Sequence, residues 1–266
     1  MTNEEFDALD WQGSALDCAA CPHRRLLASG HCALKKACVR DRYARRIDRF
    51  FGWNQTLAKD CLTHPYFEVR AVAAKYVEVF YLPRLIDDPD ETVRWSAAQR
   101  LPQRHLMQLR DDPDREVRIR VASRLDVAHL HSMMQDADYY VRTVVAQRID
   151  EGWLPRMMHD TDREVRSEVA RRIGSGLLPS MAADPDAAVR MVVAQRLAPA
   201  QLLLLRRDPD WQVRYAVAER IDCEQLGPLL IDEDEAVREL ARARWQSVGW
   251  SDLQVERSSK HEDQPR

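Results

Sequence analysis

Four cysteines lie within 21 residues near the start of the chain, at Cys18, Cys21, Cys32 and Cys38. In a reducing compartment such a cluster indicates a metal site rather than disulfides. The spacing Cys-x2-Cys-x10-Cys-x5-Cys supplies four thiolates, which suit a [4Fe-4S] cluster and a tetrahedral zinc ion equally well in ligand number. Zinc sites more often pair two Cys-x2-Cys knuckles, but the spacing alone leaves both metals open.

The segment around these cysteines is strongly basic. From Arg24 to Arg49 it holds nine Lys or Arg residues against two acids. A cube with four thiolates is anionic, so nearby cations would stabilise it and raise its potential; the candidates are Arg24, Arg25, Lys35, Lys36, Arg40 and Arg42. The same side chains could dock an acidic redox partner, or form a solvated face that balances the cluster. With four thiolates available, we expect His23 and His31 to lie outside the ligand set.

A 24-residue period organises the rest of the chain. Eight Val-Arg dipeptides follow one another at this spacing with no insertion, at Val69-Arg70, Val93-Arg94, Val117-Arg118, Val141-Arg142, Val165-Arg166, Val189-Arg190, Val213-Arg214 and Val237-Arg238. An invariant period of this kind is typical of a solenoid, in which each unit buries its apolar face against its neighbours.

Residues 184–205 illustrate one unit. Asp184 is predicted to be a helix N-cap, with Pro185 at the first helical position. An apolar stripe at i, i+4 and i+8 follows, formed by Val189, Val193 and Leu197. A leucine group that ends at Leu205 is long enough for only a turn or two. One unit therefore accommodates an α-helix of about 12 residues and a short 3₁₀ helix.

Two better-known repeats do not fit this unit. The strand of a leucine-rich repeat needs alternating leucines and an asparagine ladder, whereas asparagine occurs here only at Asn3 and Asn54. A HEAT-type helix pair needs about 40 residues. We therefore predict an all-α solenoid with a four-cysteine domain at residues 1–50, the repeats at 51–248 and a polar tail at 249–266 that is unstructured after Leu253. Within 51–248 a degenerate unit precedes eight clear ones that begin at about residue 64.

Two arginine columns run through the repeats. The Val-Arg arginine usually stands four residues after an aspartate, as in Asp90 and Arg94, which predicts an i, i+4 pair on one helix. From Val93 onward, a second arginine stands seven residues after the valine of each dipeptide. This position returns to the core side of the helix, so the arginine should bond carbonyls or the next unit's aspartates. This second column is Arg100, Arg124, Arg148, Arg172, Arg196, Arg220 and Arg244. We favour structural roles for both columns over nucleic-acid binding.

Four aromatic side chains are predicted to point away from the valine stripe: Trp95, Tyr139, Trp211 and Tyr215. Exposed Trp and Tyr are common contact anchors, and Trp211 and Tyr215 could form one aromatic surface. Burial under neighbouring units is the alternative, and we favour it.

The unit Asp-Pro-Asp…Val-Arg…Val-Ala…Arg-Leu…Leu-x-x-Leu resembles the leucine-rich repeat variant. Together with the four-cysteine segment, the chain resembles the iron–sulfur leucine-rich repeat variant proteins of nitrogen-fixing bacteria, from Cys18 to about Val248. The resemblance implies α and 3₁₀ helices alternating in two layers, wound into a right-handed superhelix, with a small [4Fe-4S] domain at the N-terminal end. It favours iron–sulfur over zinc at the four cysteines. The helix start departs from the pattern in some units, as in His64-Pro65-Tyr66.

Composition argues against several functional classes. The chain has 40 Lys and Arg against 43 Asp and Glu, a net charge of −3, so a basic field for nucleic acid is absent. No Gly-rich phosphate loop, nucleophile motif or catalytic carboxylate pair is present, so we do not expect an enzyme. The start of the sequence has no secretory signal, and no segment is long enough to cross a membrane. We expect a cytoplasmic protein.

These observations leave three functions. The first, which we predict, is an iron–sulfur protein whose solenoid binds a macromolecular partner, a protein of unknown identity, and whose cluster serves electron transfer or redox-responsive binding. A redox partner would dock at the N-terminal basic segment. The second is an interaction module in which the iron–sulfur or zinc site only caps the solenoid. The third is nucleic-acid binding through the arginine columns.

Overall fold

The computed structural model describes residues 7–259, with side chains up to residue 247. It divides into two compact units, Met1–Met133 and Met134–Arg266. Both consist of α-helices that alternate with 3₁₀ helices (η), and β-structure in residues 7–259 is limited to the isolated bridges Leu9–Ala15 and Ala33–Ala37. The predicted all-α fold is therefore confirmed.

The first unit contains the cysteine segment and the first repeats. Its elements are α1 (Arg24–Ala28), α2 (Ala44–Trp53), η1 (Gln55–Cys61), α3 (Phe67–Tyr76), η2 (Val79–Leu85), α4 (Glu91–Ala98), α5 (Gln103–Leu106), η3 (Met107–Leu109), α6 (Arg115–Arg124) and η4 (Val127–Met133). Here α3 packs against both α2 and α4, so the helix after the cysteines continues the helical layer of the repeats.

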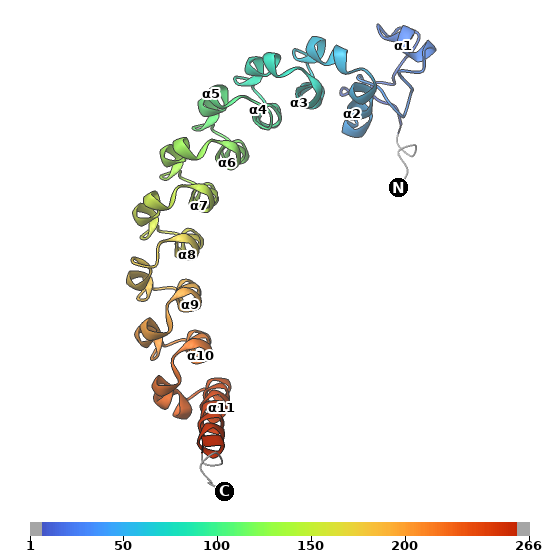
Figure 1. The fold of residues 1–266 in the computed structure, drawn as a ribbon. Coiled ribbons are helices and arrows are strands. Elements are labelled where there is room, and N and C mark those ends of the chain that lie inside the picture. Colours follow the sequence, from blue (N-terminus) through green and yellow to red (C-terminus); the bar gives the residue numbers. More distant parts are fainter. Residues whose placement is uncertain (1–6, 260–266) are drawn as a thin grey trace. The chain divides into compact units, whose positions relative to one another are not determined.

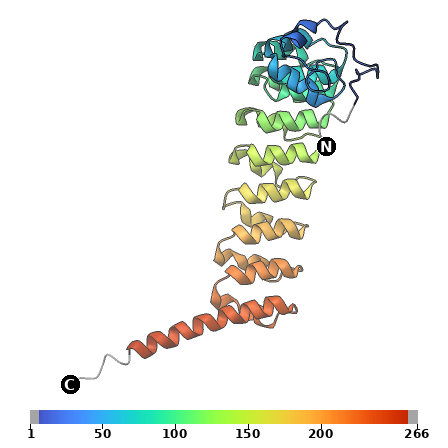
Figure 2. The ribbon, with the colours of Figure 1, turned by 90° about the vertical axis from the view of Figure 1, so that its right-hand side faces the viewer.

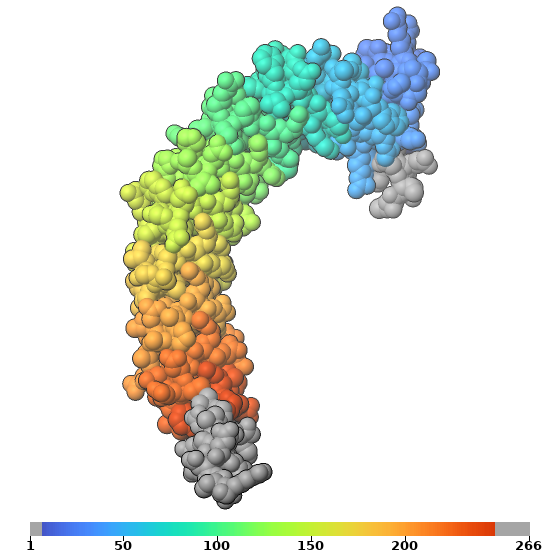
Figure 3. Space-filling model, viewed as in Figure 1, coloured from blue at the N-terminus to red at the C-terminus, as the bar shows by residue number. Residues whose placement is uncertain are grey.

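The second unit contains the later repeats. Its elements are α7 (Tyr139–Arg148), η5 (Glu151–Met157), α8 (Arg163–Arg172), η6 (Leu178–Met181), α9 (Ala187–Arg196), η7 (Pro199–Leu205), α10 (Trp211–Arg220), η8 (Cys223–Gln225), η9 (Gly227–Ile231) and α11 (Glu235–Ser259). Figures 1 and 2 show α8, α9 and α10 side by side in one layer, with the 3₁₀ helices beside them in a second layer. In the space-filling view the repeats of this unit pack without gaps (Figure 3).

The predicted apolar stripe forms the core between the two layers. Val189, Val193 and Leu197 are buried, with at most 1% of each residue exposed. The 24-residue period repeats this burial, because every valine of the Val-Arg dipeptides is fully buried. Leu202 and Leu205 of η7 close the core from the 3₁₀ side. Each such side chain contributes about 1.5–3 kcal/mol relative to an exposed one, so packing between repeats stabilises helices too short to form alone.

The helix start lies two residues later than predicted. In α9 the N-cap is Asp186, whose Oδ1 accepts the Ala188 amide at 2.8 Å, so Asp184 and Pro185 precede the helix. Asp184 instead accepts the amide of Asp186 at 2.9 Å and forms a turn before the cap. The first aspartate of Asp-Pro-Asp thus shapes the turn, and the second one caps the helix.

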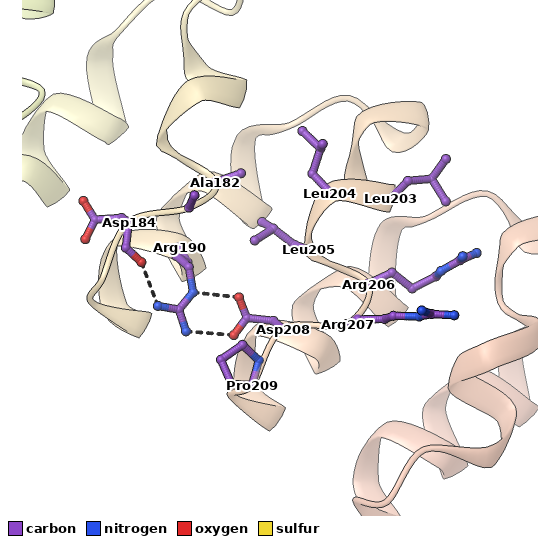
Figure 4. A pocket seen from close by; sticks show the side chains of 11 residues that line it. Ala182, Asp184, Arg190, Leu203, Leu204, Leu205, Arg206, Arg207, Asp208 and Pro209 are labelled. Atoms are coloured by element: carbon purple, nitrogen blue, oxygen red, sulfur yellow. Dashed lines mark hydrogen bonds and ion pairs between the residues drawn. The ribbon is translucent and has the colours of Figure 1, made fainter.

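The arginine of the Val-Arg dipeptide joins consecutive repeats. Arg190 donates from Nε and Nη2 to the Asp208 carboxylate, at 2.7 and 2.9 Å. Its Nη1 donates to the carbonyl of Asp184 at 2.8 Å (Figure 4). The predicted i, i+4 pair is therefore wrong, because the carboxylate at i−4 caps its own helix and the aspartate 18 residues ahead lies within reach of both donors. The same bidentate pair joins Arg70 to Asp88, Arg94 to Asp112, Arg142 to Asp160, Arg166 to Asp184 and Arg214 to Asp232.

The second arginine column caps the helix of the preceding repeat. Arg196 Nη1 donates to the carbonyls of Ala170 and Ile173, at 2.7 and 2.8 Å. These carbonyls lie at the end of α8, where backbone acceptors lack helical partners and where the helix dipole favours a cation. The predicted structural role is confirmed, with carbonyls as partners, and equivalent bonds are made by Arg100, Arg124, Arg172, Arg220 and Arg244.

The aromatic residues divide between the two expected environments. Trp95 is half-buried, and the Arg120 guanidinium lies 4.7 Å from its ring centre. Tyr215 is also half-buried, whereas Tyr139 and Trp211 are 43% and 45% exposed. Neighbouring groups therefore cover part of this set and leave Tyr139 and Trp211 at the surface.

The last helix corrects the predicted unstructured tail. Helix α11 continues to Ser259, well beyond the ten residues of a typical repeat helix, and residues 260–266 lie outside the described part of the chain. Its sequence contains no proline, so no proline stops the helix where the other repeats turn. None of the helices within residues 7–259 is long and apolar enough to cross a membrane.

Removal of one arginine of the first column should strongly destabilise the second unit. The Arg190 and Asp208 side chains are only 10% and 3% exposed, so Arg190→Ala leaves an unpaired buried carboxylate. We expect a loss of about 3–5 kcal/mol in the free energy of unfolding, measured by urea denaturation. Arg171→Ala, which removes an exposed arginine paired with Glu168, is the control, with a loss of about 0.5 kcal/mol or less. Equal losses would contradict the role of the pair.

Acid should destabilise the last repeats through Asp232, the aspartate that pairs with Arg214. Burial opposes ionisation of Asp232, but bonds from Arg214 and from the Asp234 amide outweigh it and lower the pKa of this carboxyl. An unfolded aspartate titrates near pH 3.9. The stabilisation is therefore present above about pH 4 and is lost as pH falls through the lower folded pKa. Urea denaturation at pH 7 and pH 3 should show this loss, and Asp232→Asn should reduce it; an unchanged pH dependence in this variant would refute the assignment.

Candidate metal centre

The first two cysteines lie in one tight turn. The Asp17 carboxylate accepts the Ala19 amide at 2.8 Å, and the Cys21 amide donates to the Cys18 carbonyl at 3.4 Å. Both cysteines are partly exposed, and helix α1 begins three residues after Cys21. This turn brings the two thiols close enough for Cys21 to raise the pKa of Cys18, as expected for a Cys-x2-Cys ligand pair.

The other two cysteines flank a short hairpin. Between Cys32 and Cys38 the amides and carbonyls of Ala33 and Ala37 exchange bonds of 2.9 and 2.8 Å. Lys35 forms the tip with φ of 61°, in the left-handed region that a tight turn needs. Cys32 and Cys38 are buried, at 8% and 6% exposure, and the Cys32 thiol donates to the Ala37 carbonyl at 3.3 Å. The hairpin thus brings the two buried thiols side by side.

Helix α2 holds the hairpin from both ends. The Arg46 guanidinium and the Asp41 carboxylate are fully buried and lie 2.9 Å apart, and the Cys38 amide donates to the Arg46 carbonyl at 3.1 Å. At the C-terminal end of α2, Asn54 Nδ2 donates to the His31 carbonyl at 2.8 Å. These bonds fix the backbone on either side of Cys32 and Cys38, so Asp41, Arg46 and Asn54 position the thiols without contacting a metal.

Neighbouring thiols shift the pKa values of Cys18, Cys32 and Cys38. Burial, then the nearby Cys38 and Cys21, raise the pKa of Cys18. A hydrogen bond between the Cys32 and Cys38 thiols, together with burial, raises the pKa of Cys38 far above its usual range. The same hydrogen bond lowers the pKa of Cys32. Four thiols this close resist deprotonation together unless bound cations compensate their charge. The loops therefore bring the four predicted residues together in one neighbourhood.

The arrangement of the four thiols can be compared with what a zinc ion and a [4Fe-4S] cluster each require. In residues 7–259 no three His, Cys, Asp or Glu side chains are disposed to hold a single metal ion. Four thiolates around one zinc, at bonds of about 2.3 Å, would lie about 3.8 Å apart. A [4Fe-4S] cube gives each iron its own thiolate and so separates the sulfurs more widely. Four cysteine thiols in one neighbourhood provide the ligand number that a cube requires.

The two histidines have partners of their own. The His23 ring lies 5.6 Å from the Phe50 ring, and burial, with Arg40 nearby, lowers the pKa of His23. The His31 Nδ1 lies 3.0 Å from the Ser29 carbonyl. That neither histidine replaces a thiolate stays a prediction.

The cysteine domain packs directly on the first repeat. The Trp11 ring stacks on Tyr66 at 6.2 Å and meets the His64 ring edge-on at 4.9 Å. The Tyr66 hydroxyl donates to the Arg42 carbonyl at 3.1 Å, on the loop that follows Cys38. His64 Nδ1 accepts the Tyr66 amide at 3.1 Å and so replaces the aspartate of the usual turn. The departure at His64-Pro65-Tyr66 is therefore an adaptation to the cysteine domain.

Comparisons with known proteins agree with a four-cysteine domain followed by helical repeats. Residues 8–60 match the family described as LRV protein FeS4 cluster. The structure described as "A leucine-rich repeat variant with a novel repetitive protein structural motif" is 45% identical, with a TM-score of 0.83, and the match covers 86% of this chain and 98% of that one. The chain belongs to the leucine-rich repeat variant family. Its cofactor is accordingly a [4Fe-4S] cluster, and the zinc alternative is not supported.

A second relative of this leucine-rich repeat variant protein is an "Uncharacterized 27.7 kDa protein in nifB 3'region" from Rhodobacter capsulatus. It is 54% identical over 96 residues, which are 36% of this chain. The match spans 39% of that relative's length.

The chemistry that the leucine-rich repeat variant protein supplies around its cluster is electrostatic. A bound [4Fe-4S] cluster would exchange one electron, with Cys18, Cys21, Cys32 and Cys38 as the predicted ligands. The Arg40 amide donates to the Cys38 sulfur, which favours a thiolate there. The other predicted cations are exposed, namely Arg24, Arg25, Lys35, Lys36 and Arg42, while Arg40 is half-buried.

Sequence reasoning found the cysteines but missed the residues that position them. Trp11 and Asn54 act through contacts distant in sequence, such as the 23 residues between Asn54 and His31. Asp41 and Arg46 pair locally, but their complete burial depends on the folded domain. Arg46 stands in a segment rich in basic residues, so nothing in the sequence distinguished this buried arginine from its solvated neighbours. The one available signal was His64-Pro65-Tyr66, since a departure from the repeat marks where it meets another structure.

Each predicted ligand should be required for the cluster. Cys18→Ser, Cys21→Ser, Cys32→Ser and Cys38→Ser should each lose most of the iron, the sulfide and the visible absorption, because serine is a poor ligand for iron in such clusters. Iron and sulfide analysis after anaerobic purification measures this, with about four of each per wild-type chain. Cys223→Ser, in the second unit, is the control and should retain the cluster. If one of these four variants keeps its full iron content, the cysteine that it replaces is not a ligand.

Proposed function

We propose that this protein transfers electrons to or from a protein partner through its [4Fe-4S] cluster and engages a macromolecular partner with its repeats. The observation that carries the proposal is that Cys18 and Cys21 reach the surface in a segment whose basic side chains are exposed. An electron can enter or leave from that side without crossing the protein. The exposed cations would stabilise the reduced cluster and attract an acidic partner.

Nucleic-acid binding has less support. In the part of the chain that the structure describes, both arginine columns are engaged with aspartates or carbonyls of neighbouring repeats, as in Arg190 and Arg196. Guanidinium groups held in this way are not available for phosphates. We therefore assign the arginine columns to structure. We propose no catalysed reaction and a cytoplasmic location.

A second candidate function has its own observation. The Trp11, His64 and Tyr66 ring contacts seat the cysteine domain on the first repeat, so the metal could serve only to hold a domain that covers the apolar end of the array. In that case the cluster would contribute stability without electron transfer.

Reversible reduction distinguishes these two functions. We expect dithionite to reduce the anaerobic protein with a paramagnetic signal and loss of visible absorption, and mild oxidation to restore the original spectrum. Lys35→Gln with Lys36→Gln should make the potential more negative, since the reduced cluster loses nearby positive charge. Arg171→Gln, an exposed substitution in the second unit, should leave it unchanged. A cluster that is not reversibly reduced, in a protein that unfolds on its removal, would support the structural role instead.

A further inference from the structure

One 3₁₀ helix of the second unit differs from its neighbours at the surface. At four outward positions, η7 and the turn after it carry Leu203, Leu204, Arg206 and Arg207. One repeat earlier, the corresponding residues are Pro179, Ser180, Ala182 and Ala183. The core positions of η7 are filled by Leu202 and Leu205, so the repeat does not need these leucines for packing. Leu203 and Leu204 are 44% and 59% exposed.

These side chains line a groove. It has a volume of about 680 Å³ and lies between η7 and residues 182–184 of the preceding repeat (Figure 4). We call it the leucine–arginine groove, defined by Asp184, Arg190, Leu203, Leu204, Arg206 and Arg207. A second groove of about 370 Å³ shares Arg206 and Arg207 and extends to Arg214. A third of about 400 Å³ shares Asp184 and extends to Arg166. Together they form a row along successive turns, suited to an extended chain.

The balance of charge in the groove is positive. The Asp184 carboxylate is bound by Arg166 and the Asp208 carboxylate by Arg190, each in a bidentate pair. These four charges cancel and are nearly buried.

Two further guanidinium groups lack a counter-charge. Arg206 donates only to Gln225, at 3.4 Å to the carbonyl and 3.3 Å to the side chain, and its buried Nε has no hydrogen-bond partner. Arg207 is exposed, and no carboxylate within residues 7–247 pairs with it. In the adjoining groove the exposed Glu233 already contacts Arg214 at 3.1 Å. The leucine–arginine groove therefore offers two free cations beside two exposed leucines.

We propose that the leucine–arginine groove binds an extended acidic segment of a partner protein, with carboxylates on Arg206 and Arg207 and an apolar side chain on Leu203 and Leu204. Arginine binds carboxylates with good geometry, and exposed leucines supply contact area that a charged ligand alone would not use. A nucleic acid fits less well, because no aromatic side chain lines the groove for base stacking. The inference rests on the proposed function only in requiring a protein partner, and its site lies outside the cysteine domain.

Synthetic peptides test this site in the full-length, cluster-containing protein. The probe is a fluorescent peptide of about 12 alternating Glu and Leu residues, which spans about 40 Å when extended. The comparison probes are Gln-Leu and Lys-Leu peptides of equal length and an oligothymidylate of equal charge. We expect the Glu-Leu peptide alone to bind, measured by fluorescence anisotropy, and to bind more weakly as salt is added.

Two substitutions at exposed positions should abolish this preference. The double variant Leu204→Ser with Arg207→Gln should weaken Glu-Leu binding by about tenfold or more, a change of about 1.4 kcal/mol. Arg171→Gln, an exposed arginine of α8, is the matched control and should bind as the wild type does. Circular dichroism confirms that both variants stay folded.

The remaining outcomes each overturn the inference. It fails if the Glu-Leu peptide does not bind, if the Gln-Leu peptide binds equally well, or if the double variant binds like the control. Tighter binding of the oligothymidylate would assign the groove to nucleic acid. Reversible cluster reduction without peptide binding refutes only this site, whereas peptide binding to a protein with an irreducible cluster refutes only the electron-transfer proposal.

Discussion

Each repeat depends on one interaction, in which an arginine guanidinium group bonds two successive aspartate turns. Arg190 bonds the backbone of the turn before its own helix and the carboxylate of the turn after it. A buried carboxylate without such a partner is strongly destabilising. The pairing therefore makes each turn incomplete without the adjacent repeat, and it adds specificity to an apolar core that would tolerate small slips between layers.

The second arginine column extends the same dependence to the helix ends. A ten-residue helix leaves a large share of its backbone carbonyls without helical partners. At the end of α8 the missing donors come from Arg196 of the following repeat. Apolar packing, turn charges and helix capping thus all join one repeat to the next, which explains how short helices form a stable structure.

The first clear repeat has to meet these requirements beside α2 and η1, which precede it in place of a clear repeat. His64 supplies the turn acceptor with an imidazole nitrogen, and Tyr66 and Trp11 cover it with aromatic rings. The iron–sulfur domain thus takes the place of a preceding repeat. Electron transfer and capping of the repeats are both compatible with this geometry, so the contact with the repeats does not distinguish the two functions. Reversible reduction of the cluster does.

The period of the repeats and the cysteine constellation could be predicted from the sequence because both are patterns of identity and spacing. The valine stripe, the alternation of α and 3₁₀ helices and the carbonyl-bonding role of Arg196 followed from helical periodicity and proved correct. The partner of Arg190 did not, because a local i, i+4 rule competes with an aspartate that only the folded stack brings close. The N-cap was displaced for a related reason, since Asp184 and Asp186 are both capable caps and only tertiary contacts decide between them.

The reach of the Arg190 side chain also limits how the array can change in length. The guanidinium touches one turn 6 residues behind it and another 18 residues ahead, and these two separations add to the 24-residue repeat. Loss or gain of one residue anywhere between two turns would move one of these contacts out of register. Such an array can grow or shrink by duplication or deletion of whole repeats, but it has little tolerance for the insertion or deletion of a single codon.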